Sequence, residues 1–273
     1  MKKIFFLLAA LLVLLGATAC SSDSNKTGGN TAMTSMVVEN RIVPAQGNPV
    51  LSATNYTVTI NYGQNTITVS GSVKMPGGNT VQFITPDMKM NLVSEYTYNF
   101  TAGQMASVIG GNISGISGTY DFNTNILYIA FQCDDCHVYA SRMVQFPYST
   151  TIFTDTTQSV QPLTTESSGY LFDVGEGSQI TYLTISYWGS EKQQVSADLY
   201  FTGSSGIDTK ITADGYTFSA DTLTGHQSIN TNIRDTLYDV RGTVSNQGRT
   251  LNLTYRKGKY KATARGYMFV THQ

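Results

Sequence analysis

Apolar and polar residues alternate with a period of two over most of the chain beyond residue 50, and turn-forming residues separate the alternating runs. In the first half these runs are Tyr56–Tyr62, Thr66–Met75, Thr80–Ile84, Glu95–Thr101, Ile116–Phe122, Ile126–Gln132 and His137–Phe146. Because the turns between them are short, as at Gly63-Gln64-Asn65, neighbouring runs are expected to pair as antiparallel strands. The segment Gln104–Ile109 fits a short helix and a connecting loop equally well. The pattern predicts an all-β protein.

The order of motifs in the first half recurs in the second half, 124–127 residues later. The matched pairs are Val58–Tyr62 with Leu183–Tyr187, Val69–Val73 with Val195–Leu199, Ile84–Asp87 with Ile211–Asp214, and Gly118–Phe131 with Gly242–Tyr255. A constant order at a nearly constant separation favours a duplicated unit over chance resemblance among alternating strands. We therefore predict two similar tandem antiparallel β domains, residues 36–153 and 169–273, joined by a linker at residues 154–168. Either a sandwich or a barrel satisfies the pattern of each domain.

The first nineteen residues predict a signal peptide. Lys2 and Lys3 precede an apolar run, Ile4–Leu15, and small residues lead from this run to Cys20. The run is shorter than the ~20 apolar residues that span a bilayer as a helix. Residues 20–35 are largely polar, which is typical of a flexible tether between a membrane and a folded body.

The motif Ala17-Thr18-Ala19-Cys20 resembles the lipobox of bacterial lipoproteins, although Ala17 stands where leucine is usual. The resemblance implies cleavage before Cys20 and attachment of acyl chains to its thiol. Ser21 after the cysteine implies sorting to the outer membrane. The start Cys20-Ser21-Ser22-Asp23-Ser24 is similar to the mature ends of Bacteroidetes-type lipoproteins, some of which reach the cell surface. An ordinary signal peptide, cut after Ala19, is the alternative reading.

The composition is typical of an all-β protein, and the charge excludes a general nucleic-acid binder. The chain has 17 Tyr, 25 Gly and only 6 Pro, as is typical of β proteins. Removing Lys2 and Lys3 with the signal leaves 15 basic and 18 acidic residues, a net charge of −3. A chain that is nearly balanced and only 13% charged is no general nucleic-acid binder.

The motif Cys133-Asp134-Asp135-Cys136-His137 has the spacing of c-type haem attachment. Its expected place at a hairpin tip offers no pocket for haem, and the matching hairpin Arg256–Tyr260 has neither cysteine nor histidine. Three potential ligands are also one short for a zinc or copper site. We therefore expect no cofactor and predict a disulfide between Cys133 and Cys136, since directly opposed strand residues lie within disulfide range in an oxidising compartment.

Sequence motifs of catalysis are missing. Neither His226 nor His272 belongs to a nucleophile motif, and His226 is expected in a loop. Asp87 and Asp214 stand at matching places in the two halves and are candidates for a carboxylate pair. Turn residues that end a strand are the alternative reading for both. The protein is therefore not expected to be an enzyme.

Two features suggest contact with a partner. The C-terminal hairpin concentrates basic residues, of which Arg256, Lys257 and Lys259 lie at its tip, and these either form a docking patch or simply solvate a sheet edge. Trp188 is the single tryptophan, and its position before Gly189 suggests a loop tip where its ring could contact a ligand.

These observations favour a cell-envelope lipoprotein that acts as a non-enzymatic binding or structural module. Its expected partners are the membrane, through the lipid anchor, and a polysaccharide or another envelope protein, but no nucleic acid. A fimbrial or adhesin subunit is one alternative, similar in architecture to Bacteroidetes-type fimbrial lipoproteins, with Arg41 as a cleavage site that frees a strand for exchange. A carbohydrate-active hydrolase with an unrecognised site and a lipid or small-ligand carrier with a hollow interior are others.

Overall fold

The computed structural model describes residues 30–142, 144–175, 179–189, 197–202, 207–227 and 234–270. Over these ranges the chain forms twenty β-strands and no helix, which confirms the all-β prediction. Consequently no helix in the described part of the chain is long and apolar enough to cross a membrane.

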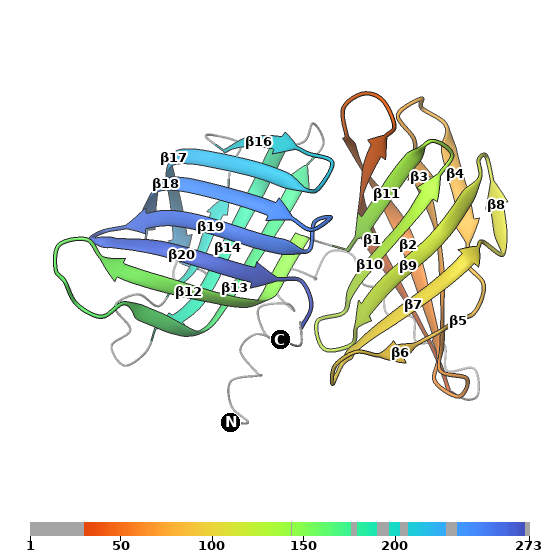
Figure 1. Cartoon of the computed structure of the whole chain (residues 1–273), viewed down its shortest axis with the longest axis horizontal. Coiled ribbons are helices and arrows are strands. Elements are labelled where there is room, and N and C mark those ends of the chain that lie inside the picture. The colour runs from red at the N-terminus through yellow and green to blue at the C-terminus, as the bar shows by residue number, and fades with distance from the viewer. Residues whose placement is uncertain are drawn as a thin grey trace.

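The first eleven strands form one antiparallel sheet, shown in red to yellow-green in Figure 1. They are β1 (Thr31–Pro44), β2 (Val50–Asn61), β3 (Thr66–Lys74), β4 (Thr80–Ile84), β5 (Met88–Lys89), β6 (Asn91–Leu92), β7 (Thr97–Gln104), β8 (Ser107–Ile109), β9 (Ile113–Asp121), β10 (Ile126–Cys133) and β11 (Cys136–Ser141). Their order in the sheet is β6-β7-β9-β10-β11-β1-β2-β3-β4-β8, with β5 beside β3. Because β5 pairs with β3 while β6 pairs with β7, the short segment that holds β5 and β6 connects distant parts of the sheet.

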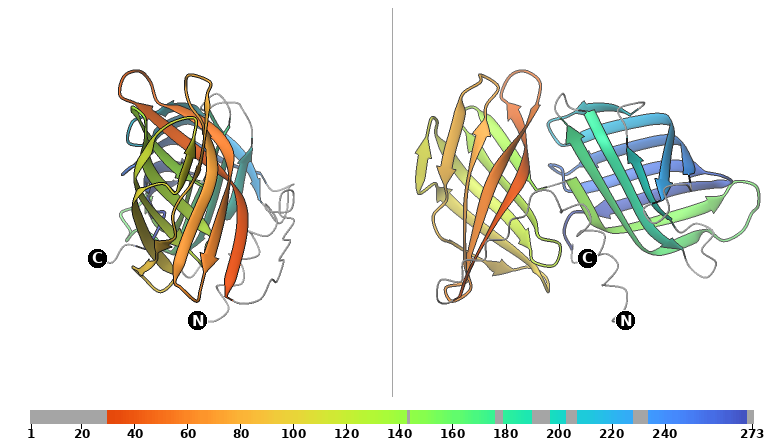
Figure 2. Two further views of the ribbon diagram at one scale, coloured as in Figure 1. Left: turned by 90° about the vertical axis from the view of Figure 1, so that its right-hand side faces the viewer. Right: turned by 180° about the vertical axis from the view of Figure 1, so that it is seen from behind.

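The remaining nine strands form a second antiparallel sheet with the order β15-β14-β13-β12-β20-β19-β18-β17-β16. They are β12 (Val144–Asp155), β13 (Leu163–Gly175), β14 (Gln179–Gly189), β15 (Ala197–Thr202), β16 (Asp208–Ile211), β17 (Tyr216–Gln227), β18 (Arg234–Ser245), β19 (Thr250–Lys257) and β20 (Tyr260–Tyr267). Strand β15 also pairs with β17, so eight of these strands form a closed ring with β16 outside it. The second domain is therefore a barrel rather than a two-layer sandwich, and Figure 2 shows it beside the first domain.

The two sheets repeat the same topology. Strands β12, β13, β14 and β15 take the places of β1, β2, β3 and β4, and β17 to β20 take those of β7, β9, β10 and β11. The register agrees as well, because Gly118 pairs with Ile129 in the first sheet and Gly242 pairs with Leu253 in the second. The protein thus consists of two similar tandem β domains.

The sequence matches that suggested the repeat are only partly in register with it. The match between Gly118–Phe131 and Gly242–Tyr255 joins equivalent strands. In contrast, Val58–Tyr62 lies at the end of β2, which stops at Asn61, whereas Leu183–Tyr187 lies in β14, which takes the place of β3. The match of Val69–Val73 joins β3 to β15, although β15 takes the place of β4. The match of Ile84–Asp87 likewise joins the end of β4 to the end of β16, the strand after β15. Alternating strands resemble one another closely enough for a displacement by one strand to pass unnoticed in the sequence.

Several expected boundaries differ from those of the structure. Strand β1 begins at Thr31, within the segment assigned to the tether, and the second sheet begins at Val144. The segment 154–168, expected as a linker, comprises the end of β12, a connection and the start of β13. The cause is that β12 pairs with β20, more than a hundred residues away, and no local pattern reveals such a pairing. Likewise Gln104–Ile109 contains the end of β7 and strand β8.

Each domain packs an aromatic ring over a glycine on the neighbouring strand. Phe100 faces Gly118 in the first domain, and Phe218 faces Gly242 in the second. A Cβ atom built on Gly242 would lie 1.9 Å from Cζ of Phe218. These glycines are therefore required by packing, since any side chain would displace the ring from the core.

The buried cluster of the second domain includes residues of the first domain. Leu127 and Ile129 of β10 point into the first domain, whereas Ile126 and Tyr128 of the same strand belong to the buried cluster of the second domain. Because alternate residues of a strand face opposite sides, both sides of β10 are buried. The second domain therefore covers the outer surface of the first domain along this strand.

Candidate functional site

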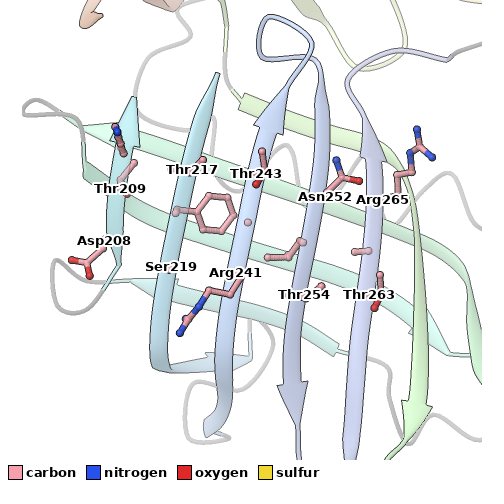
Figure 3. A pocket seen from close by; sticks show the side chains of 15 residues that line it. Asp208, Thr209, Thr217, Ser219, Arg241, Thr243, Asn252, Thr254, Thr263 and Arg265 are labelled. Carbon is pink, nitrogen blue, oxygen red and sulfur yellow. The ribbon is translucent and has the colours of Figure 1, made fainter. Parts of the chain in front are cut away.

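A hollow with a volume of about 700 Å³ lies on the surface of the second domain, across β16, β17, β18, β19 and β20. Figure 3 shows the side chains that line it. This volume falls within the ~300–1,000 Å³ typical of ligand sites. A second hollow, of about 160 Å³, lies between the domains and is too small for such a ligand.

Strand pairing arranges the polar side chains of the hollow in two parallel rows. The first row, which we call the cationic row, runs across the strands through Lys210, Thr217, Thr243, Asn252 and Arg265. The second row runs beside it through Asp208, Ser219, Arg241, Thr254 and Thr263. Between the rows lie residues whose side chains are buried in the barrel, such as Leu253 and Ala264. The hollow is thus the outward surface of the sheet.

The shape of the hollow follows from side-chain length. Short hydroxyl and amide side chains form its floor, and longer charged side chains rise at its border. Figure 3 shows Arg241 and Arg265 extending away from each other at opposite sides of this floor. Threonine, serine and asparagine can each donate and accept hydrogen bonds, so the floor suits a ligand rich in hydroxyl groups.

Three cations line the hollow, and they differ in their partners. Nη2 of Arg241 lies 3.0 Å from Oδ1 of Asp221, in an ion pair exposed to solvent. The guanidinium of Arg265 lies over the ring of Tyr267, with 5.5 Å between Cζ and the ring centroid. Within the described part of the chain, neither Lys210 nor Arg265 forms an ion pair with a carboxylate. The cationic row therefore carries positive charge at both ends and no acidic residue.

The same surface of the first domain has a different chemistry. In the register of the repeat, Tyr128, Ala130 and Tyr139 occupy the places of Asn252, Thr254 and Thr263. These three residues pack against the core of the second domain. The repeat thus presents one surface twice: it is apolar and covered in the first domain, and polar and open in the second. We call the open copy, on β16 to β20, the open face.

The three basic residues at the tip of the C-terminal hairpin, Arg256, Lys257 and Lys259, are each paired with an aspartate. Nε of Arg256 lies 2.5 Å from Asp239, and Nζ of Lys257 lies 2.6 Å from Asp235. Nζ of Lys259 lies 2.7 Å from Asp155. Their aspartate partners come from other strands, which the sequence pattern did not connect with the hairpin. The hairpin tip therefore carries three separate ion pairs rather than a free cationic patch.

Cys133 and Cys136 are directly opposed across a two-residue turn, as the sequence suggested. Both side chains are buried, and the structure holds both as thiols. Burial raises the pKa of each thiol to about 11. At neutral pH such thiols are protonated and therefore weak nucleophiles. The disulfide stays a prediction.

The other candidates for chemistry lie apart from one another. Asp87 accepts a hydrogen bond from the hydroxyl of Thr68, whereas Asp214 accepts two from the backbone of the β18–β19 turn. The two aspartates belong to different domains and form no pair. His226 lies in β17 rather than in a loop, because the pairing of β17 with β18 extends to Arg234. The described residues include no group of three or more potential metal ligands of the His, Cys, Asp and Glu types.

Arg41 occupies the boundary between the domains. Its side chain is 2% exposed, and Nη1 donates to the carbonyl oxygens of Thr212 and Ala213. Strand β1 pairs with β2 on one side and β11 on the other. A protease would have no access to this peptide bond, so the position does not suit the cleavage site considered for a fimbrial subunit.

Three of the remaining residues fall outside what the structure describes. Cys20 and His272 lie beyond the described ranges, and of Trp188 only the backbone is described, as part of β14 opposite Ser167. The structure therefore adds nothing on the contact predicted for its ring.

Sequence reasoning missed the open face. Its side chains come from five strands, and each strand contributes only two or three polar residues that resemble any solvated position. The available signal was the comparison of the two halves at a separation of 124 residues, where Tyr128 is replaced by Asn252 and Tyr139 by Thr263.

Comparison with known proteins gives little guidance. No protein-family model matches the chain, and no curated protein matches it. Among solved structures, the chain is similar to a crystal structure from Bacteroides fragilis named "putative outer membrane protein". The two share 11% identity over 86% of this chain and 96% of the other, with a TM-score of 0.36. Similarity at this level carries no argument about function.

Proposed function

We propose that the protein is a non-enzymatic binding module of the cell envelope, held at the outer membrane by lipid on Cys20, and that its ligand contacts the open face. The observation that carries the proposal is the change of chemistry between the two copies of the repeated surface. The first copy holds the domains together, and the second is polar, hollow and uncovered. The signal-like and lipobox-like residues before Cys20 support the location.

The chemistry of the hollow supports binding rather than catalysis. Its lining offers one carboxylate, Asp208, and no histidine or cysteine. General acid–base catalysis in hydrolysis of a glycosidic bond uses two carboxylates. Hydrogen-bonding side chains on a rigid sheet are instead suited to hold a ligand without altering it.

The test uses the purified lipidated protein in detergent against a panel of polysaccharides. We expect the wild-type protein to bind one class of polysaccharide and to leave it chemically unchanged. Thr243→Tyr should abolish binding, because the ring fills the floor of the hollow at an exposed strand position that tolerates tyrosine. Thr101→Tyr is the matched control, since Thr101 is an exposed strand residue of the first domain.

Two results would contradict the proposal. One is equal binding by the wild-type protein and Thr243→Tyr, which would remove the open face from the interaction. The other is release of shortened sugars, which would make the protein an enzyme. Intact mass of the membrane-derived chain tests the anchor independently, because acyl chains on Cys20 must be absent from Cys20→Ser.

A further inference from the structure

We infer that the ligand of the open face is an anionic polysaccharide that lies along the cationic row, across the strands. This inference rests on the proposed function and adds the class and direction of the ligand. Its basis is the position of the two cations that have no carboxylate partner among the described residues, Lys210 and Arg265, at opposite ends of one row of hydrogen-bonding side chains.

The distance between Lys210 and Arg265 favours a polymeric ligand over a small anion. Lys210 lies on β16 and Arg265 on β20, four strand positions apart in the sheet. At ~4.8 Å per strand, their Cα atoms are separated by about 19 Å. Because Arg265 extends away from the floor of the hollow (Figure 3), one small anion on that floor does not contact both side chains. A chain that repeats its negative charge can contact both at once, and its intervening hydroxyl groups would meet Thr217, Thr243 and Asn252.

The residues that line the hollow also favour an anionic polysaccharide over other macromolecular ligands. Its only aromatic residue is Phe218, which is 3% exposed and therefore unavailable for stacking on a sugar ring or a base. Neutral glycans and single-stranded nucleic acids depend strongly on such stacking. Protein interfaces need aromatic or large apolar anchors, and membrane insertion needs apolar side chains. The open face offers charge and hydrogen bonds instead.

Arg265, at one end of the cationic row, supports the assignment of an anionic ligand. The guanidinium group presents a planar set of donors that matches carboxylate and sulfate groups, and the ring of Tyr267 beneath it restricts its orientation. Lys210 supplies a less directional charge at the other end, which tolerates variation in the position of the next anionic group.

The experiment measures binding of the purified full-length lipidated protein to polygalacturonate, to heparin and to fully methyl-esterified polygalacturonate, which lacks the charge. We expect tight, salt-sensitive binding to at least one anionic polymer and none to the uncharged one. Lys210→Gln and Arg265→Gln should each weaken binding about tenfold, since each removes one charge-assisted contact. Lys74→Gln, at an exposed position of β3, is the control and should bind like the wild type. Monomeric galacturonate should bind at least tenfold more weakly than the polymer.

The outcomes distinguish the two proposals. If the uncharged polymer binds as well as the charged one, or if both glutamine variants bind normally while Thr243→Tyr does not, the anionic assignment is wrong and the open face remains the site. Binding to neither anionic polymer would also overturn it. If Thr243→Tyr has no effect on any ligand, both proposals fail.

Discussion

Arg41 is the buried residue that connects the two domains most directly. Its guanidinium lies 4.6 Å from the ring centroid of Tyr139 in the first domain and donates to two backbone carbonyls in the second. Nearby, Tyr216 donates a hydrogen bond to Glu39, again from one domain to the other. A buried charge with these partners stabilises the contact only while all partners are present.

We predict that Arg41→Met lowers the free energy of unfolding by about 2–4 kcal/mol, because the carbonyl groups of Thr212 and Ala213 lose a charged donor at the boundary between the domains. Urea denaturation measures the change. Arg265→Gln, at an exposed position, should change the same quantity by less than about 0.5 kcal/mol. Equal stability of Arg41→Met and the wild type would mean that the domains are held together by other contacts.

Asp155 makes the stability of the folded protein depend on pH in the acidic range. Its carboxylate accepts hydrogen bonds from the backbone and hydroxyl of Thr157 and pairs with Lys259. These contacts, led by the hydrogen bond from Lys259, lower the pKa of Asp155 below its ordinary value. Because the folded pKa is lower than the unfolded one, the stabilisation is complete above the ordinary pKa of about 3.9 and is lost as the pH falls below it.

It follows that Asp155→Asn should melt at a lower temperature than the wild type at neutral pH, and that the difference should shrink near pH ~3. Thermal melting at both pH values measures this. Asp221→Asn removes a solvent-exposed ion pair and should have little effect at either pH. A difference that grows on acidification would show that the sign of the argument is wrong.

Within the sheets, a position where an aromatic ring packs over a glycine does not accommodate a larger residue. Gly242→Ala places a methyl group where Phe218 packs, so Phe218 must move out of the core of the second domain. We predict a loss of about 1–3 kcal/mol of stability, the usual cost of overpacking. Gly103→Ala is the control, since nothing lies within 4 Å of a Cβ at that position. A Gly242→Ala variant as stable as Gly103→Ala would show that the ring has room to move.

Strand positions could largely be predicted from the sequence, and strand partners could not. Thr80–Ile84 coincides with β4, and Ile126–Gln132 falls within β10, because alternation and turn residues are local properties. The assignment of β12 to the second domain depends on its pairing with β20, which has no local signal. The burial of both sides of β10 follows from packing between domains, which the apolar residues Ile126 and Tyr128 do not reveal by themselves.

For the molecule as a whole, the repeat accounts for the contact between the domains and for the surface that we propose as the ligand site. One copy of the surface is apolar and packs against the second domain, and the other is polar and open to solvent. The candidate site was hidden in the sequence because each of the five strands contributes only two or three polar residues, which look like any other solvated positions. Once the strands are placed side by side, Lys210 and Arg265 stand at the ends of a single row.

The most direct measurement is a crystal structure of the protein with an anionic oligosaccharide long enough to reach from β16 to β20. We predict that the sugar chain lies across β16 to β20, with negatively charged groups against Lys210 and Arg265 and hydroxyl groups against Thr243 and Asn252. A sugar bound elsewhere on the protein, with the hollow of the second domain empty, would contradict the account.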